Sequence, residues 1–224
     1  MWTWFPSKGG EASEEKEMME GYKLINIIEE LKKMSQKRGF ENKDDFHQLL
    51  ERCKDITLSN EDADFLIELY SKAKNLYIRN TILKALVFCE DIDLKDFFFK
   101  AFKKERYLDM RLTAVRGYAK FATEKEVEKL MSTFTEILLK RPESTPYNYQ
   151  EYELLRSAFG LPYLVNQYGY ACFIQAYEQE EKQYNAMPDA FKGHFTLNER
   201  GDIVQLRSLG ERKKMLDEFR SIGK

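Results

Sequence analysis

Two segments that lie 32 residues apart share one pattern, and this repetition limits the possible folds more than any other feature of the chain. Residues 76–91 read LYIRNTILKALVFCED, and residues 108–123 read LDMRLTAVRGYAKFAT. A weaker third copy, LLRSAFGLPYL, begins at residue 154. One helix pair cannot bury its apolar face alone, so we expect repeated pairs to stack and share a core. The matched positions of the two better copies are Ile78 and Met110, Arg79 and Arg111, Thr81 and Thr113, Leu83 and Val115, Lys84 and Arg116, and Ala85 and Gly117.

Helical periodicity extends along most of the chain. Apolar residues recur every three or four positions, which is typical of amphipathic helices with one buried face. The pattern predicts that Phe97, Phe98, Leu130 and Met131 are core residues. The expected helices include residues 18–34, 46–53, 65–73, 78–89, 94–102, 110–121, 127–138, 152–163, 173–177 and 215–222.

Several helices carry start signals in the sequence. A Ser or Thr followed three residues later by Asp or Glu predicts a capping box, in which each side chain bonds to the other residue's backbone N–H. Asn42 is the expected N-cap of the second helix, and Asp93 is expected to open the helix that holds Phe97. The three expected boxes are Ser59 with Asp62, Thr123 with Glu126, and Ser208 with Glu211.

Other signals interrupt the helical pattern. Residues 141–150, RPESTPYNYQ, are expected to form a loop in which Pro142 and Pro146 break the helix. Pro162 is expected to kink the following helix or to start a new one. Residues 194–206, HFTLNERGDIVQL, alternate apolar and polar residues on both sides of NERG, which predicts a short β-hairpin.

The repeat resembles HEAT-like α-helical repeats. The resemblance rests on a first helix, a short turn and the pattern [IM]-R-x-x-[AI]-[LV]-[KR]-[AG], taken from residues 78–85 and 110–117, and it covers about residues 43–184. The period of 32 is shorter than the ~40–47 residues of that family, and its usual first-helix proline is absent. The resemblance implies a curved scaffold, generally a binding protein, whose second helices line the concave face.

The expected fold is therefore all-α. We expect a short α-solenoid of HEAT-like helix pairs, followed by a small C-terminal β-hairpin and a capping helix. Residues 1–16 are expected to be a flexible lead-in, with an open role for the aromatic residues Trp2, Trp4 and Phe5. Residues 17–185 form the helical-repeat domain, and residues 186–224 form the C-terminal cap.

Composition narrows the classes of function. The chain has 36 Lys and Arg against 38 Asp and Glu, so a net charge of -2 argues against coating by nucleic acid. No apolar run reaches the ~18 residues of a membrane helix, and MWTWFPSKGG does not read as a secretory signal. Cys53, Cys89 and Cys172 show no metal or disulfide spacing and read as buried apolar residues. A cytoplasmic protein without membrane contact is expected.

No stretch carries a self-sufficient catalytic motif. His47 and His194 stand alone in sequence, which favours structural roles, and no nucleophile elbow, phosphate-binding loop or zinc motif occurs. DNA-alkylation-repeat glycosylases have a HEAT-like fold of similar length, but they need Trp and Asp in a basic cleft. Here Asp109 is more simply a partner of its helix dipole. We expect no enzyme, no cofactor and no metal.

Two surfaces are candidates for partner binding. On helical spacing, Lys84 and Phe88 point away from the core face, and Arg116 and Lys120 repeat this one copy later. These four residues would form a basic stripe on the concave face and would attract an acidic partner. The second candidate is the tyrosine-rich end, where eight of thirteen tyrosines lie between residues 147 and 184. Tyr147 and Tyr149 lie in the expected loop and are the better candidates there.

Two functional readings follow. The first is a non-catalytic protein-binding scaffold of a bacterial cytoplasm, and its size and single-domain layout resemble immunity proteins that neutralise a toxin domain. The alternative is a nucleic-acid-binding or DNA-alkylation-repeat-like protein. Near-neutral charge and the absence of Trp from the repeats favour the first reading.

Overall fold

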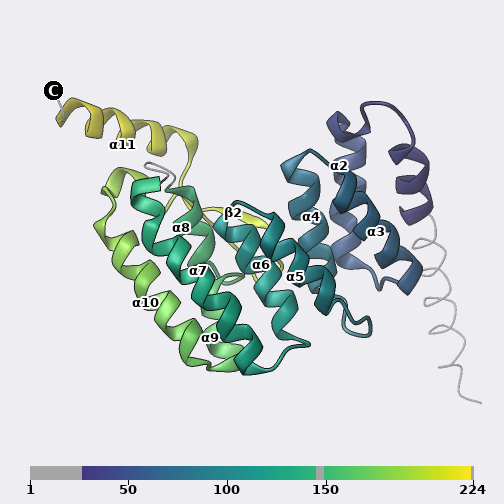
Figure 1. Ribbon diagram of the computed structural model, residues 1–224. Coiled ribbons are helices and arrows are strands. Elements are labelled where there is room, and N and C mark those ends of the chain that lie inside the picture. Colours follow the sequence, from purple (N-terminus) through teal and green to yellow (C-terminus); the bar gives the residue numbers. More distant parts are fainter. Residues whose placement is uncertain (1–26, 145–148, 223–224) are drawn as a thin grey trace, which may run out of the picture. The chain divides into compact units, whose positions relative to one another are not determined.

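The computed structural model describes residues 27–144 and 149–222 (Figure 1). The protein is mostly α-helical and ends in a two-stranded antiparallel hairpin and a final helix, as expected. Contacts group the chain into two compact units, Met1–Ala85 and Leu86–Lys224, with the boundary inside helix α4. None of the described helices is long and apolar enough to cross a membrane.

The first unit contains a helix at residues 27–35 and helices η1 (Phe40–Asn42), α2 (Asp44–Glu51), η2 (Arg52–Asp55), α3 (Asn60–Lys72) and the start of α4 (Leu76–Val87). The Ser59–Asp62 capping box is confirmed at the start of α3. The predicted Asn42 cap is wrong, because Asn42 ends η1 and Lys43 precedes α2 without a side-chain cap. The Glu41 carboxylate instead accepts from the amides of Lys74 and Asn75, at 3.1 and 3.0 Å.

The core of the second unit forms around α6 (Leu108–Ala119), which packs against both α5 (Lys95–Lys104) and α7 (Glu124–Ser144). Ten of the twelve α6 residues are buried, as in a helix surrounded by others. Phe98 is completely buried, and its ring lies where a Cβ on Gly117 would stand, 2.3 Å away. Glycine at position 117 therefore permits the close approach of α5 and α6. The predicted core positions Phe97, Phe98, Leu130 and Met131 are confirmed.

The predicted break at Pro142 is wrong, because α7 continues through Pro142 to Ser144. Proline lacks the N–H that would bond to the carbonyl four residues earlier, and this residue is Leu138. The side chain of Gln183 supplies the missing donor, with Nε2 at 2.9 Å from the Leu138 oxygen. The Thr123–Glu126 pair at the other end of α7 is present in part, since the Glu126 carboxylate accepts from the Thr123 amide at 2.8 Å.

Three shorter helices follow: α8 (Gln150–Leu155), α9 (Leu161–Tyr168) and α10 (Ala171–Ala186). The prediction that Pro162 would kink a helix or start a new one is confirmed in its second form, since Pro162 lies in the first turn of α9. Helix α10 packs against α7, α8 and α9, with Phe173 fully buried.

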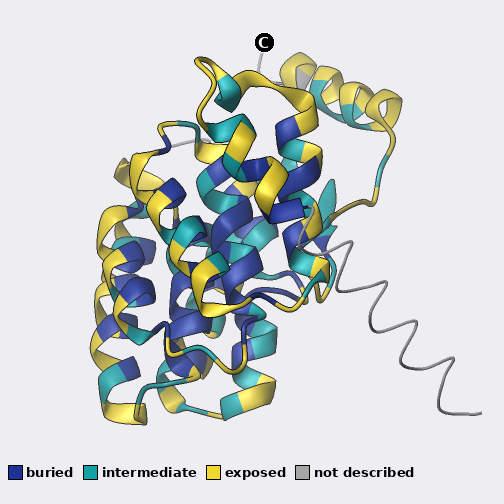
Figure 2. Ribbon diagram, turned by 90° about the vertical axis from the view of Figure 1, so that its right-hand side faces the viewer, coloured by how far each residue is buried: buried dark blue, intermediate teal, exposed yellow. Residues whose placement is uncertain are grey.

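The predicted hairpin is confirmed as β1 (Phe195–Leu197) and β2 (Ile203–Gln205), which pair with Thr196 opposite Val204. It follows the short helix η3 (Asp189–Phe191) and precedes α11 (Leu209–Ile222). The predicted Ser208–Glu211 box is confirmed, with the Ser208 amide 2.8 Å from the Glu211 carboxylate. Figure 2 shows that α11 is largely exposed.

Candidate functional site

Exposed apolar side chains are concentrated at the C-terminal end of the chain. We use "C-terminal arm" for residues 195–222, which comprise β1, β2 and α11. Five of the ten large exposed apolar residues in the described parts of the chain lie in this arm. Large apolar side chains that are exposed together in one part of a protein often mark a binding site. The five residues are Ile203, Val204, Leu206, Leu209 and Phe219.

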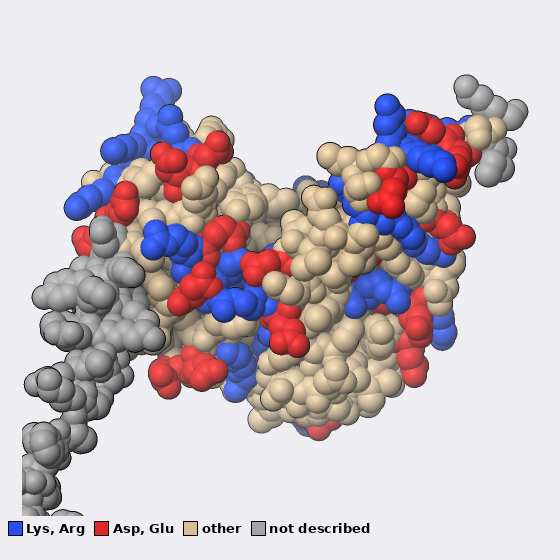
Figure 3. Space-filling view, turned by 180° about the vertical axis from the view of Figure 1, so that it is seen from behind, with Lys and Arg blue, Asp and Glu red and all other residues tan. Residues whose placement is uncertain are grey.

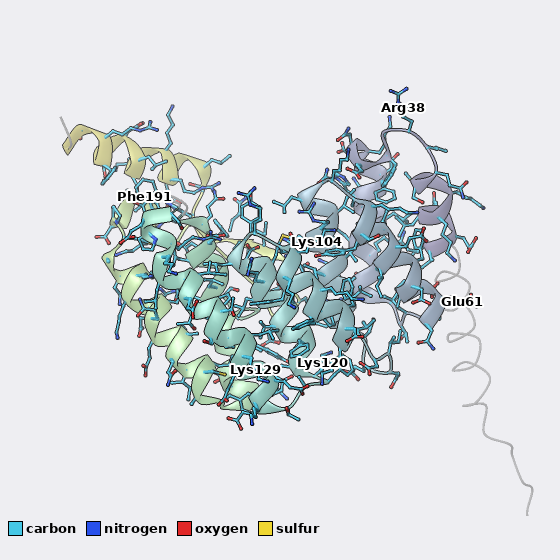
Figure 4. The ribbon with its side chains drawn as sticks, viewed as in Figure 1. Arg38, Glu61, Lys104, Lys120, Lys129 and Phe191 are labelled. Carbon is cyan, nitrogen blue, oxygen red and sulfur yellow. The ribbon has the colours of Figure 1, made fainter. Side chains whose placement is uncertain are left out.

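A groove of about 650 Å³ separates α11 from the residues around η3, β1 and the start of α8. Leu209 and Leu216 line it from α11, Phe195 lines it from β1, and Tyr149 and Phe191 line it from the body of the second unit. The Phe191 ring lies 4.4 Å from that of Tyr149 in a tilted contact and 5.4 Å from that of Phe219 in an edge-to-face contact, so ring contacts hold α11 at one side of the groove. Figure 4 labels Phe191 below α11. The groove thus combines apolar walls with open access.

The charged side chains of the groove are mainly basic. Arg212, Lys213 and Arg220 line it from α11 together with the carboxylates of Glu153 and Asp217, and Asp217 lies 3.7 Å from Arg220. Among the described residues, no ion pair engages Arg212 or Lys213. Two cations beside apolar walls favour a ligand that carries both carboxylates and apolar side chains.

A buried glutamate anchors the chain segment that enters the arm. Glu153 is buried, and its Oε1 accepts from the Gly193 amide, from the His194 amide at 3.4 Å and from the Tyr184 hydroxyl at 3.3 Å. Gly193 adopts a positive φ of 67°, which favours glycine. Arg207 donates to the Lys192 carbonyl and ties the end of β2 to the same point.

The structure corrects the sequence-based picture of the basic stripe. The exposure predicted for Arg116 is wrong, since this side chain is only 5% exposed. Its guanidinium lies 3.5 Å from the Tyr163 ring centre and 4.1 Å from that of Phe159, and Nη1 donates to the Phe159 carbonyl at 2.9 Å. Desolvation lowers the pKa of Arg116. Arg116 therefore acts as a core residue that joins α6 to the α8–α9 turn.

The other stripe residues are partly engaged by the chain itself. Lys120 is exposed, but its Nζ donates to the carbonyls of Val87 and Cys89 at the end of α4. Phe88 and Lys84 are half-buried. The face seen in Figure 3 carries interspersed basic and acidic side chains. A role for Lys84, Phe88 and Lys120 in partner binding stays a prediction.

Of the two loop tyrosines, Tyr147 lies outside the described residues, whereas Tyr149 lines the groove. Sequence reasoning thus places one residue in the groove and misses its partners on η3 and α11. The signal that could have found them is the amphipathic final helix, whose apolar residues the sequence analysis assigns to a cap on the preceding repeat.

A buried carboxylic acid lies on α10, away from the groove. Glu180 has no exposed surface, and neither carboxylate oxygen has a hydrogen-bond partner among the described residues. Desolvation raises the pKa of Glu180 to about 8, although the charge of Arg156 opposes this shift and those of Glu181 and Glu153 add to it. The group is therefore largely protonated at neutral pH.

The remaining chemical groups fit structural roles. His47 and His194 each hydrogen-bond a nearby main-chain carbonyl at 2.8 Å. Cys53 and Cys89 are buried free thiols, and Cys172 is a half-buried one. Within residues 27–144 and 149–222, no cluster of His, Cys, Asp and Glu is suited to hold a metal ion. No protein-family model matches the sequence, and no curated protein or solved structure is similar enough to indicate a family.

Proposed function

We propose that this chain is a non-catalytic protein-binding module and that the groove beneath α11 receives a segment of its partner. The observation that carries the proposal is the groove of about 650 Å³, whose apolar wall includes Leu209, which is 74% exposed, together with Leu216 and Phe191. Soluble proteins rarely leave such surface uncovered unless a ligand or another protein covers it. An amphipathic partner helix or extended segment fits a groove with these walls.

The partner is expected to be acidic. Arg212 and Lys213 offer positive charge at the groove without a competing internal ion pair, so acidic side chains flanking an apolar anchor would be attracted to them. The partner is acidic, as expected from the sequence, but we propose that it contacts mainly the C-terminal arm instead of the basic stripe. The burial of Arg116 supports this assignment, since a core residue cannot also contact a partner.

Within this function, the helical body is the scaffold that presents the groove. We propose that its helix pairs stack in a HEAT-like manner, on the strength of the repeated pattern at residues 78–85 and 110–117. The size of the chain favours one kind of binding protein, an immunity protein that binds an acidic toxin domain in the cytoplasm. Nucleic-acid binding is the alternative function, and the following experiment distinguishes it from protein binding.

The test is capture from a nuclease-treated lysate with matched variants of α11. Arg212→Glu combined with Lys213→Glu reverses the charge of the groove, whereas Lys214→Glu makes the same kind of change on the same helix outside it. We expect wild type and Lys214→Glu to retain the same protein and the double variant to lose it. Equal retention by all three would remove the groove from the proposal, and binding that disappears with nuclease would favour nucleic acid.

A further inference from the structure

The hairpin has a longer hydrogen-bond ladder than its two three-residue strands suggest. The Asn198 amide donates to the Asp202 carbonyl at 3.0 Å, and the Leu206 amide donates to the His194 carbonyl at 3.1 Å. Hydrogen-bonded pairs alternate with non-hydrogen-bonded pairs in an antiparallel ladder. Thr196 and Val204, midway between these bonds, therefore form a hydrogen-bonded pair, and Val204 directs its backbone groups toward β1.

The neighbours of Val204 present a free edge. Because backbone direction alternates along a strand, the N–H and C=O groups of Ile203 and Gln205 point away from β1. In the part of the chain that the structure describes, no other main-chain group bonds to them. The three residues of β2 include no lysine or proline, two residue types that often protect an edge strand. A bulge lies just beyond β2, where the amides of Leu206 and Arg207 both donate to the His194 carbonyl. The apolar side chains of this edge are exposed as well, at 67% for Ile203, 41% for Val204 and 55% for Leu206.

We propose that β2 pairs with β2 of a second copy of this chain, antiparallel and about a two-fold axis at Val204. The register follows from the edge itself. Centred on Val204, the pairing sets Ile203 opposite Gln205 of the other copy and Gln205 opposite its Ile203, which allows four backbone hydrogen bonds. It also brings the two Val204 side chains together as a non-hydrogen-bonded pair, where side chains approach most closely.

Other symmetric registers use fewer groups. Centring on Ile203 would set Gln205 opposite Gly201, which lies in the turn with its amide bonded to Asn198. Centring on Gln205 would set Ile203 opposite Arg207, whose amide already bonds to His194 at 3.3 Å. Only the register centred on Val204 uses both free residues of the edge in both copies. A two-fold interface requires a surface that is complementary to itself, and the edge of β2 meets this requirement in this register. We therefore assign a second copy of the chain as its partner. The inference goes beyond the proposed function and does not depend on the groove.

A disulfide across the two-fold axis tests the register. Non-hydrogen-bonded partners have Cα atoms about 4.5 Å apart, within the range that a disulfide spans. In a Cys172→Ser background, which leaves only buried native thiols, we expect Val204→Cys to oxidise to a covalent dimer. Leu206→Cys is the matched control, because its exposed side chain would lie roughly 14 Å along the strand from its own copy. Equal cross-linking of both variants, or none by Val204→Cys, would overturn the register.

Sedimentation equilibrium tests the dimer itself without any cysteine. Wild type is expected to show twice the chain mass of 26.6 kDa as its concentration is raised. Val204→Glu would oppose two carboxylates at the axis and is expected to remain monomeric, while Val204→Thr keeps the β-branched shape and the dimer. Melting temperatures of the monomers identify any variant that fails to fold. Wild type that stays monomeric at the highest concentration reached would overturn the proposal, even if the groove still binds a partner.

Discussion

Arg116 illustrates at the scale of one residue how a shared repeat position can acquire a different role. The repeat aligns it with Lys84, and helical spacing predicts that both side chains point away from the main core face. The aromatic rings that cover Arg116 come from residues 159 and 163, beyond the inserted loop, and no periodic pattern in α6 encodes them. Local spacing fixes the direction of a side chain, but what lies in that direction is decided by distant sequence.

Charge reversal at this residue is therefore expected to destabilise the fold. Arg116→Glu would place a carboxylate among aromatic rings and against the Phe159 carbonyl, at a cost of about 3–5 kcal/mol in the free energy of unfolding. Arg38→Glu is the control, because Arg38 is exposed in a loop and its loss should change stability by only ~0.5 kcal/mol. Urea denaturation of both variants gives the comparison. Similar stability of both would show that Arg116 is accessible to solvent after all.

Glu180 predicts an unusual dependence of stability on pH. Its folded pKa of about 8 lies above the ordinary value of 4.5, so the native state holds a proton that the unfolded state has lost between these values. The contribution of this group to stability is complete below pH 4.5 and is lost as pH rises to about 8, with a slope of at most ~1.4 kcal/mol per pH unit. Glu180→Gln removes this titration.

Denaturation curves at several pH values check this expectation. The free energy of unfolding of Glu180→Gln relative to wild type should increase steadily between pH 5 and pH 8. Glu178→Gln, at an exposed position on the same helix, serves as the control and should leave the pH profile close to that of wild type. A parallel profile for wild type and Glu180→Gln would contradict the buried, protonated carboxyl.

At the scale of helices and strands, local signals are the most reliable guides. The boxes at Ser59 and Ser208 and the NERG hairpin turn involve residues within a few positions of one another, so the sequence contains the whole interaction. Pro142 differs because its compensation comes from Gln183 on α10. A proline rule that considers only the helix containing the proline misses a donor supplied by another helix.

The Pro142–Gln183 arrangement can be tested by a double-mutant cycle. Gln183→Leu removes the donor to the Leu138 carbonyl and is expected to cost about 1 kcal/mol in the free energy of unfolding. In a Pro142→Ala background the cost should be smaller, because the alanine introduced there has a backbone amide that can donate to the same carbonyl. The difference between the two costs is the coupling energy. A coupling near zero would show that Gln183 does not compensate for the proline.

At the scale of the whole molecule, the sequence predicts the class of fold and the nature of its C-terminal elements. It predicts one stacked repeat domain over residues 17–185, whereas contacts divide the described chain into two compact units at Ala85. The solenoid arrangement stays a prediction. From its sequence periodicity, the final segment is expected to be an amphipathic helix that covers the last repeat. What periodicity cannot show is that Leu209 remains 74% exposed and that an edge-to-face ring contact attaches α11 to η3.

The attachment of the arm is expected to be separable from the stability of the helical body. Glu153→Ala removes the acceptor shared by the Gly193 and His194 amides, so amide hydrogen exchange should accelerate in residues 193–222. Protection in α6 should change far less. Gln150→Ala, at an exposed groove residue of the same helix, is the control. Uniform acceleration in both α6 and the arm would mean that Glu153 supports the whole unit instead.

The ring contacts among Tyr149, Phe191 and Phe219 have a practical optical consequence. Both tryptophans of the chain are at positions 2 and 4, outside the described residues, so the described structure contains tyrosine as its strongest ultraviolet fluorophore. A Phe191→Trp variant with Trp2 and Trp4 replaced by Phe would place one emitter between α11 and Tyr149, at a ring separation of about 4.4 Å. Phe219 of α11 lies against this position when the arm is seated, so the emission wavelength of the indole would report, in real time, whether the arm is seated or lifted.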